Sequence, residues 1–418
     1  MLFMKEHVTK QARRAKEASH KMALIPVEVR NAALLAMADA LEARQEEILE
    51  VNDKEVAAAI EKGTRVNMID RLTLTPKRIA GMAEGIRQVV KLGDPIGKMD
   101  FEVVRPNGLK IRRVRVPIGV VGIIYEARPN VTADAIALCI KSGNACLLRG
   151  GSEAIRTNKK IVDVMREAAI AKGLPENAVA FISIIDRDAV VVMCRLRKLV
   201  DVIIPRGGAG LIQRVIEHST VPVIETGKGV CHTFIDKTAD FDTAIKICVN
   251  AKTSRPSVCN AMETLLIHKD IAEEFLPMVA QALLEKNVEL RGDEACQKIF
   301  PDMKPATEDD WTTEYNDLIL SIKIVEDVDA AIEHINKYST QHSDAIITKD
   351  KENAAKFEQQ IDSSTVYVNA STRFTDGFEF GLGAEIGIST QKLHARGPMG
   401  LEALTTMKYL VEGDGQIR

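Results

Sequence analysis

The sequence contains few aromatic residues and little excess charge. Aromatic side chains make up 4% of the 418 residues and include one Trp, so the stacking platforms typical of single-strand binding proteins are not indicated. The formal net charge is −3 although 28% of the residues are charged, and no basic face for nucleic acid is expected. Because the chain is too long for one ordinary core, its length predicts two domains and a smaller element.

Long apolar runs and paired cysteines are also lacking. No run approaches the roughly 18 apolar residues that a membrane helix needs, and the charged N-terminal stretch has no apolar signal-peptide segment. The seven cysteines form no CxxC pair and no Cys–His zinc spacing, which indicates reduced thiols and no metal site. We therefore expect a cytoplasmic enzyme with no membrane partner.

The first part of the chain shows helical spacing, and a ribbon-like stretch follows it. Residues 5 to about 92 read as helices with apolar faces. Residues 101–116 alternate in polarity and turn at 106–108, which predicts a β-hairpin. The C-terminal stretch near 405–412 also alternates and is expected to pair with this hairpin. Unpaired strand edges are usually covered, so we expect a homodimer or a dimer of dimers built through this ribbon.

Two regions alternate short apolar strands with helices. Strands are expected at 119–125, 145–149, 179–183, 199–205 and 221–225 in the first region, and at 230–236, 265–268, 318–325, 343–348 and 365–369 in the second. This alternation predicts an α/β fold with two doubly wound parallel sheets and a small β oligomerisation element. The expected domains are a nucleotide-binding domain (1–100 and 117–226), a catalytic cysteine domain (227–400) and the β-ribbon (101–116 and 401–418).

One cysteine is the candidate nucleophile. Cys259 follows Pro256 on a turn and precedes an apolar strand. A thiolate is the strongest side-chain nucleophile near neutral pH, and the positive charges of Lys252 and Arg255 favour the ionised form. From these residues alone, the alternative is a buried structural cysteine, which is where most free cysteines lie.

Two glycine turns follow strands and indicate nucleotide binding. Glycine lets a phosphate approach the backbone, a helix N-terminus supplies N–H groups, and arginine clamps phosphate oxygens. The standard GxGxxG pattern is absent, and two glycines after a strand are alternatively a plain turn. The candidate cofactor residues are Arg149, Gly150, Gly151, Ser152, Arg206, Gly207, Gly208 and Gly210.

These pieces, taken in order, resemble the aldehyde dehydrogenase superfamily over nearly the whole chain. The turn after 199–205, Glu225 in ETGKG and Cys259 in SRPSVCN look like that superfamily's cofactor turn, glutamate and nucleophile, with its spacing. Considered without the resemblance, Glu225 is either a solvated strand end or a general base. Long motifs such as VPIGVVGIIYEARPNVTADA and PATEDDW are similar to the gamma-glutamyl phosphate reductase family within the superfamily.

The resemblance implies a reaction and its residues. It implies reduction of L-glutamyl 5-phosphate by NADPH to L-glutamate 5-semialdehyde, with release of phosphate through a Cys259 thioester, in proline biosynthesis. Ser152 stands where NAD-preferring members carry an acid, which favours NADPH. Asn130 lies near Ala127, where the superfamily places an oxyanion-hole asparagine. The implied catalytic residues are Cys259, Glu225 and Asn130, and the implied substrate-binding residues are Arg128, Lys252, Arg255, Asn369, Ser371, Thr372 and Arg373.

The same resemblance implies a partner and leaves alternatives. A transient contact with glutamate 5-kinase is expected. The alternative functions are a generic NAD(P)-dependent oxidation of aldehydes to free acids and a non-catalytic protein on the same fold. An aldehyde oxidiser needs a glutamate that activates water, whereas water would destroy the thioester of a reductase.

Overall fold

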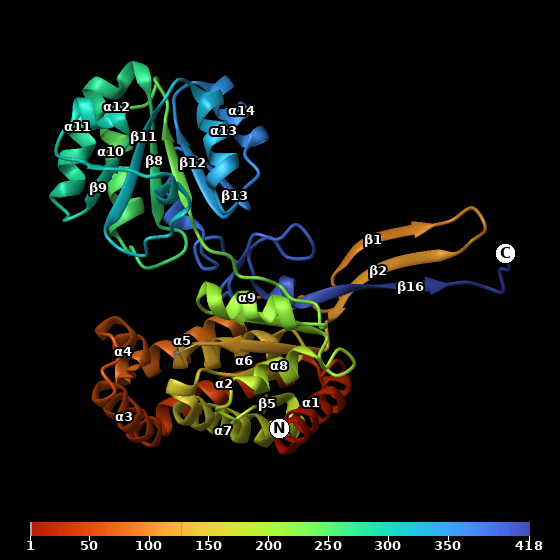
Figure 1. Cartoon of the computed structure of the whole chain (residues 1–418). Coiled ribbons are helices and arrows are strands. Elements are labelled where there is room, and N and C mark those ends of the chain that lie inside the picture. The colour runs from red at the N-terminus through yellow and green to blue at the C-terminus, as the bar shows by residue number, and fades with distance from the viewer. Residues whose placement is uncertain (1, 127) are drawn as a thin grey trace. The chain divides into compact units, whose positions relative to one another are not determined.

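The computed structural model describes residues 2–126 and 128–418 and divides into two compact units. Unit 1 comprises Met1–Thr226, Gly381–Gly387 and Met399–Arg418, and unit 2 comprises Gly227–Phe380 and Ile388–Pro398. Residues 381–387 and 399–400, which the sequence grouped with the cysteine domain, pack with unit 1. Each unit contains a parallel sheet with helices, and a small antiparallel sheet is also present, which confirms the predicted fold class (Figure 1).

Unit 1 begins with the predicted helical region. Its helices are α1 (Leu2–Met22), α2 (Val27–Ala43), α3 (Gln45–Glu61), α4 (Val66–Leu72) and α5 (Pro76–Lys91). Helix α5 shows how the sequence defines a boundary, because the Thr75 side chain accepts a hydrogen bond from Arg78 N and Pro76 occupies the first turn. Apolar side chains such as Leu34 and Met37 are fully buried, as amphipathic helices require.

The sheet of unit 1 places two loops side by side. Its strands lie in the order β5–β4–β3–β6, and all of their pairings are parallel. The strands are β3 (Val120–Tyr125), β4 (Ala145–Arg149), β5 (Val179–Phe181) and β6 (Val202–Arg206), and the helices are α6 (Pro129–Lys141), α7 (Ile155–Ala171), α8 (Asp188–Cys194) and α9 (Ala209–His218), with 3-10 turns η1 (Ser152–Ala154) and η2 (Glu176–Ala178). The strand order reverses between β3 and β6, so the loops that follow these strands meet at the carboxyl edge, where such sheets bind ligands.

The predicted strand at 221–225 is wrong. Only an isolated bridge joins Val223 to Ile203, through hydrogen bonds from Ile203 N to Pro222 O and from Ile224 N to Ile203 O. Pro222 has no N–H to donate, which limits pairing on this side of the sheet. Glu225 therefore follows a single bridge and not a full strand.

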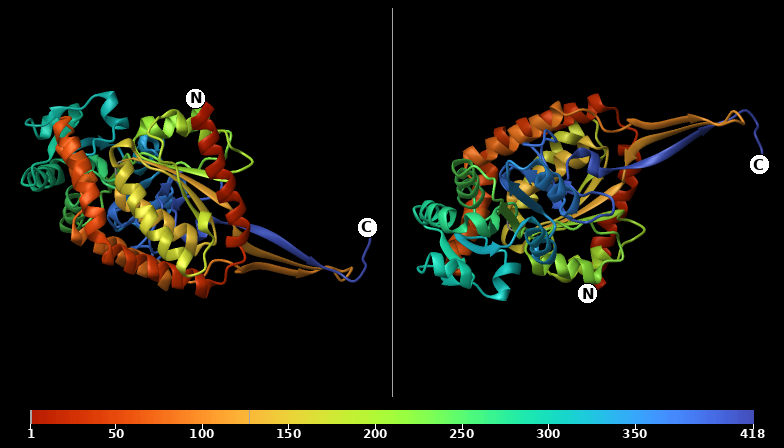
Figure 2. Two further views of the ribbon diagram at one scale, coloured as in Figure 1. Left: turned by 90° about the horizontal axis from the view of Figure 1, so that it is seen from below. Right: turned by 90° about the horizontal axis from the view of Figure 1, so that it is seen from above.

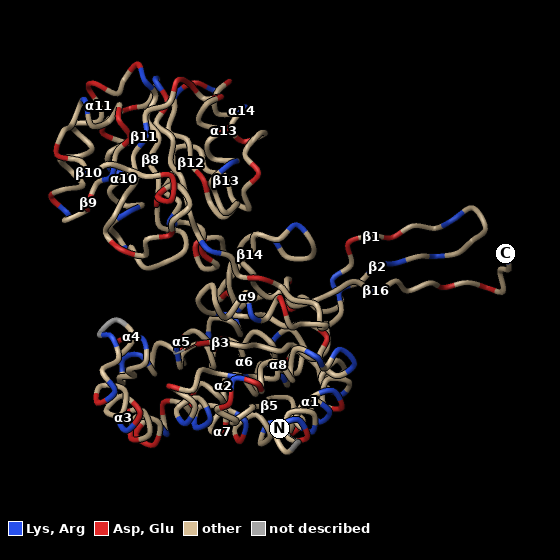
Figure 3. Tube along the Cα trace, in the orientation of Figure 1, with Lys and Arg blue, Asp and Glu red and all other residues tan. Residues whose placement is uncertain are grey.

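The three-stranded ribbon belongs to unit 1 and confirms the predicted hairpin and its C-terminal partner. Strands β1 (Met99–Val104), β2 (Lys110–Pro117) and β16 (Thr405–Glu412) lie antiparallel in the order β1–β2–β16. Gly108 has φ +88° at the hairpin turn, a value that favours glycine. The ribbon extends from the helices of unit 1 as an arm (Figure 2). Its acidic and basic residues lie on facing strands (Figure 3), and two ion pairs are Arg113–Asp100 at 2.8 Å and Lys110–Glu102 at 2.9 Å.

Unit 2 contains the larger parallel sheet, in the order β10–β9–β11–β8–β7–β12–β13. The strands are β7 (Cys231–Ile235), β8 (Met262–His268), β9 (Glu289–Gly292), β10 (Lys304–Pro305), β11 (Ile319–Val325), β12 (Ser343–Ile347) and β13 (Thr365–Val368), with the short antiparallel pair β14 (Ile388–Ser389) and β15 (Gly397–Pro398). The helices are α10 (Phe241–Thr253), α11 (Lys269–Leu284), α12 (Glu294–Ile299), α13 (Val328–Tyr338) and α14 (Lys351–Gln360), with 3-10 turns η3 (Glu308–Thr312) and η4 (Thr372–Phe374); turn η5 (Leu401–Leu404) belongs to unit 1. Leu265, Ile267 and Phe275 are fully buried in the core between β8 and α11. Across residues 2–126 and 128–418, no helix combines the length and apolarity of a membrane span.

Candidate active site

In unit 1, the loop after β3 meets the turn at the end of β6. This turn, residues 206–208, is the anion-binding turn. Glu126 N donates to Arg206 O at 3.1 Å, and Gly208 N donates to Glu126 Oε2 at 2.9 Å. A Cβ on Gly207 would lie 2.6 Å from the carboxyl carbon of Glu126, so only glycine leaves room for the carboxylate. Because α9 begins at Ala209, its N-terminal dipole faces this negative charge. The turn therefore accommodates a negatively charged group, which here is the carboxylate of Glu126.

The other predicted glycine turn is built differently. Arg149 is 6% exposed at the end of β4, and its Nη2 donates to Ile185 O at 3.0 Å. Burial lowers the pKa of Arg149, and its Nε has no hydrogen-bond partner among the described residues. A Cβ on Gly150 would lie 2.2 Å from Asn158 Nδ2, so internal packing requires this glycine. Gly151 is buried, and Ser152 is exposed at the start of η1.

Asn130 and Asp134 of helix α6 lie near Arg206, the first residue of the anion-binding turn. Asn130 is exposed in the first turn of α6, and its Nδ2 lies 3.5 Å from Asp134 Oδ2. Desolvation raises the pKa of Asp134 to about 6, against the opposing effect of the nearby Arg206 charge. The sequence did not single out Asp134 or Glu126, because acidic residues at helix starts and strand ends are common.

The remaining predicted residues of unit 1 are Arg128, Glu225 and Gly210. Arg128 and Glu225 are half-buried, and Gly210 in α9 has open space where a Cβ would stand. Ala127, the position aligned with the superfamily's oxyanion asparagine, lies outside the described residues. Arg187 and Arg214, whose charges act on Arg149, were missed because they lie on a loop and on a helix that no motif marks.

Cys259 lies in unit 2, on the turn between α10 and β8, and is half-buried, whereas every other cysteine is buried. The start of β7 packs against its backbone. A Cβ on Gly229 would overlap the carbonyl oxygen of Cys259 at 1.4 Å, and Cys231 Sγ donates to that oxygen at 3.3 Å. Gly229 and Cys231 thus fix the position of the turn that presents the sulfur.

The segment 371–375 is bound to the same turn. Asn260 Nδ2 donates to Arg373 O at 3.1 Å and to Thr375 O at 2.9 Å, and Thr372 Oγ1 donates to Asn260 O at 2.8 Å. The buried Ser371 side chain accepts from Arg373 N at 3.3 Å and caps η4. The structure thus brings Ser371, Thr372 and Arg373 to the cysteine turn, where Asn260 joins them.

Two arginines add positive charge around Cys259. Arg255 is exposed on the turn, and Arg373 Nε donates to Ser254 Oγ at 3.0 Å. Burial lowers the pKa of Arg373, and the neighbouring charge of Arg255 acts in the same direction, while the charge of Cys259 opposes both. This arrangement favours an anion close to the sulfur.

Two predicted substrate residues serve other purposes. Lys252 is fully buried, and its Nζ donates to Glu263 Oε2 at 2.5 Å, so it is not open to a ligand. The helix α10 directs it into the core, although it lies near Cys259 in sequence. Asn369 Oδ1 accepts from Thr348 N and its Nδ2 donates to Thr348 O, both at 2.9 Å, which occupies the amide in a backbone clamp.

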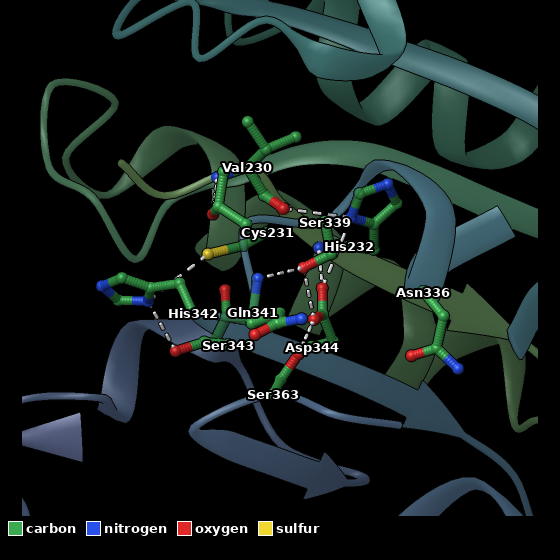
Figure 4. A network of polar contacts seen from close by, with 12 residues as sticks. Val230, Cys231, His232, Asn336, Ser339, Gln341, His342, Ser343, Asp344 and Ser363 are labelled. Atoms are coloured by element: carbon green, nitrogen blue, oxygen red, sulfur yellow. Dashed lines mark hydrogen bonds and ion pairs between the residues drawn. The ribbon is translucent and has the colours of Figure 1, made fainter. Parts of the chain in front are cut away.

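A buried network of polar side chains joins the N-terminal ends of strands β7 and β12, next to the turn that carries Cys259 (Figure 4). Asp344 Oδ1 accepts from His232 N at 2.7 Å, and its Oδ2 accepts from Ser339 Oγ at 2.8 Å. The His342 ring lies with Nδ1 3.8 Å from Cys231 Sγ, and burial lowers the pKa of His342 to about 4. Burial also raises the pKa of Cys231, so this thiol stays protonated at neutral pH. No sequence motif marks this network.

The sequence and the fold define the class of the protein. The model of the aldehyde dehydrogenase family matches residues 2–298 and 309–409. The chain belongs to the aldehyde dehydrogenase family, whose members are oxidoreductases that use NAD(P). An engineered glycolyl-CoA reductase with bound NADP+ has the same fold, with a TM-score of 0.71 at 16% identity over 97% of this chain and 96% of its own.

Within the family, three similar proteins of more than 50% identity carry the name gamma-glutamyl phosphate reductase. The gamma-glutamyl phosphate reductase of Caldanaerobacter subterraneus subsp. tengcongensis is 56% identical over 408 residues, which cover 98% of this chain and 99% of the relative. That of Clostridium botulinum is 56% identical over 415 residues, covering 99% and 100%. The crystal structure of the Thermotoga maritima gamma-glutamyl phosphate reductase matches with a TM-score of 0.97 at 51% identity, covering 98% of this chain and 99% of the other.

Proposed function

We propose that the chain reduces L-glutamyl 5-phosphate to L-glutamate 5-semialdehyde with NADPH and releases phosphate, the second step of proline biosynthesis from glutamate. The names and the full-length identity of the relatives support this activity. The structural observation that carries it is the half-buried Cys259 on a turn flanked by Arg255 and Arg373. Cations at the sulfur suit a substrate that carries an acyl phosphate.

The residues of unit 2 define the steps of the proposed reaction. The Cys259 thiolate attacks the acyl carbon, the bond to phosphate breaks, and a thioester on Cys259 results. Backbone N–H groups of the turn stabilise the oxyanion, a contribution typically worth ~3–4 kcal/mol. Arg255 binds the phosphate, and Arg373 binds the amino-acid end. The buried Ser371 and Thr372 hold the segment that presents Arg373, because their hydroxyls are bonded to Arg373 N and Asn260 O. After reduction, the hemithioacetal on Cys259 collapses to the aldehyde and the thiolate returns.

The residues of unit 1 are assigned to the cofactor. When bound, NADPH supplies the hydride that reduces the acyl carbon. The anion-binding turn at 206–208 fits its phosphates, and Arg149, at the end of β4, or Arg206, at the end of β6, is the proposed contact for the 2′-phosphate. Asn130 is the proposed side-chain donor to the oxyanion. Glu225 handles a proton or positions the cofactor, because water activation would destroy the thioester.

We also propose how the chain is organised and assembled. Unit 1 is the nucleotide-binding unit, unit 2 the catalytic unit, and the ribbon joins two copies into a homodimer or a dimer of dimers. The ribbon leaves strands β1 and β16 at its edges, with Phe101, Val104, Tyr409 and Val411 exposed. A cytoplasmic location and a transient contact with glutamate 5-kinase complete the proposal, because a labile acyl phosphate benefits from direct transfer.

The reverse reaction tests this function. The protein is mixed with NADP+ and L-glutamate 5-semialdehyde, with and without inorganic phosphate, and NADPH is followed by absorbance. The proposal predicts sustained NADPH formation only with phosphate, because phosphate must release the thioester. Equal sustained rates without phosphate would show an ordinary aldehyde oxidiser that forms a free acid.

A further inference from the structure

The anion-binding turn of unit 1 already holds an anion that belongs to the chain. The Glu126 carboxylate accepts from Gly208 N at 2.9 Å and lies against the Cα of Gly207, directly before α9. Helix α9 runs over Ala209–His218, long enough for a dipole at its N-terminus. The carboxylate thus lies where the N–H groups and the dipole would otherwise face a phosphate.

The backbone of Glu126 is anchored independently of its side chain. Glu126 N donates to Arg206 O at 3.1 Å, and the residue continues directly from β3. Because this bond involves only backbone atoms, displacement of the half-buried side chain would leave it in place. One N–H donor cannot fully satisfy a carboxylate and a phosphate at once, and two anions at this distance repel each other. Binding of a pyrophosphate at the turn thus requires the carboxylate to leave.

We infer that Glu126 is an internal competitor of the cofactor's pyrophosphate. It occupies the turn in the free chain, is displaced when the cofactor binds, and returns when the cofactor leaves. The glutamate thereby weakens the binding of every ligand that carries a pyrophosphate and speeds its release. This inference rests on the proposed use of NADP(H) and adds a residue that sets its affinity.

The competition predicts a selective effect of removing the carboxylate. The ligands are NADP+, which carries a pyrophosphate, and adenosine 2′-monophosphate, which does not. Their dissociation constants are measured by titration calorimetry for the full-length wild type, Glu126→Ala and Glu126→Gln. Glu126→Ala is expected to bind NADP+ roughly three- to tenfold more tightly, the size of a partly exposed anion at a helix N-terminus. Adenosine 2′-monophosphate should bind all three proteins equally.

Two comparisons separate the competition from general effects. Glu217→Gln removes the same charge from an exposed site on α9, where Glu217 accepts from Gln213 at 2.8 Å, and should leave NADP+ affinity unchanged. Glu126→Gln keeps an acceptor for Gly208 N and should give a smaller gain than Glu126→Ala. Melting temperatures verify that each variant is folded, and Glu126→Gln carries the test if Glu126→Ala does not fold.

Several outcomes would overturn the inference. Unchanged or weaker NADP+ binding by folded Glu126 variants would show that the carboxylate contributes a favourable contact, such as a hydrogen bond to a ribose hydroxyl. An equal gain for adenosine 2′-monophosphate, or the same gain in Glu217→Gln, would show a general effect of charge. Failure of the wild type to bind NADP+ at all would contradict the proposed function itself and remove the basis of the inference.

Discussion

At the scale of single residues, Cys259 differs from the other cysteines in exposure and setting. It is half-buried on a turn fixed by Gly229 and Cys231, whereas Cys248 is fully buried in α10. We expect Cys259→Ala to reduce turnover to background while the melting temperature and NADPH binding stay unchanged. Cys248→Ala should retain turnover and lower stability only. Substantial turnover by the Cys259 variant, measured as NADPH oxidation with L-glutamyl 5-phosphate, would end the covalent mechanism.

The ion pair of Lys252 and Glu263 is a second residue-scale feature. Both side chains are buried, and burial raises the pKa of Glu263 to about 7 while the lysine opposes this. Lys252→Met leaves a carboxylate without its partner and should lower the free energy of unfolding by ~3–5 kcal/mol. The matched double variant Lys252→Met/Glu263→Leu removes both charges and should recover most of this loss in urea unfolding. A single variant as stable as the wild type would show that the pair contributes little.

His342 makes stability depend on pH. Burial lowers the pKa of His342 to about 4 from 6.5, so below pH 6.5 the unfolded chain binds a proton that the folded chain does not. The stabilisation is complete above pH 6.5 and is lost as the pH falls towards 4, by about 1.4 kcal/mol per pH unit for one such group. His342→Asn should reduce the slope of unfolding free energy against pH by up to one proton in this window. Identical slopes for the two proteins would contradict the assignment.

The sequence predicted some of the residues that lie near Cys259, the candidate nucleophile, but not the directions of their side chains. Cys259, Arg255 and Arg373 are close in the structure, as expected from their motifs. Lys252 is equally close to Cys259 in sequence, yet its side chain points into the core from α10. Tertiary packing decides which face of a helix is buried and which partner a buried charge finds. The local sequence around Lys252 does not specify either.

At the scale of elements, periodic helices and most short apolar strands were predictable, whereas two short helices were not. Helices α1–α5 and the strands on either side of Cys259 follow from the apolar pattern. The segment 221–225 has the composition of a strand, but Pro222 restricts it to one bridge. Helices α8 and α9 went unassigned because seven to ten residues give few turns of periodicity.

The prediction for the elements concerns the three-stranded ribbon, which we expect to hold the dimer together. We expect the full chain to scatter light as a dimer or a multiple of dimers, and a chain ending at Leu404, which lacks β16, to scatter as a monomer. Tyr409→Asp/Val411→Asp keeps the strand but places charges on side chains that are 58% and 57% exposed, and should also dissociate the assembly.

A matched control is available on another surface. Ile170→Asp changes an exposed apolar residue of α7 that is 41% exposed, and it should leave the assembly intact. If the full chain is a monomer, or if the two ribbon variants stay assembled, the ribbon has another purpose.

At the scale of the whole molecule, the proposed function assigns the cofactor to unit 1 and the nucleophile to unit 2. The order of the two glycine turns, Glu225 and Cys259 along the chain predicted this assignment because it matches the superfamily. The contact of Glu126 with the anion-binding turn could not be predicted, because it joins loops 82 residues apart in sequence. Contacts between distant segments follow from sheet order, which the local pattern does not specify.

The measurement that tests the central claim most directly is a single-turnover burst. The protein is mixed with NADP+ and L-glutamate 5-semialdehyde without phosphate, and NADPH absorbance is followed together with the intact mass of the chain. The account predicts a burst of about one NADPH per active site, a matching acyl adduct on Cys259, and release of that adduct when phosphate is added. Cys259→Ala should give neither burst nor adduct. An NADPH burst from that variant, or steady turnover of the wild type without phosphate, would contradict the Cys259 thioester.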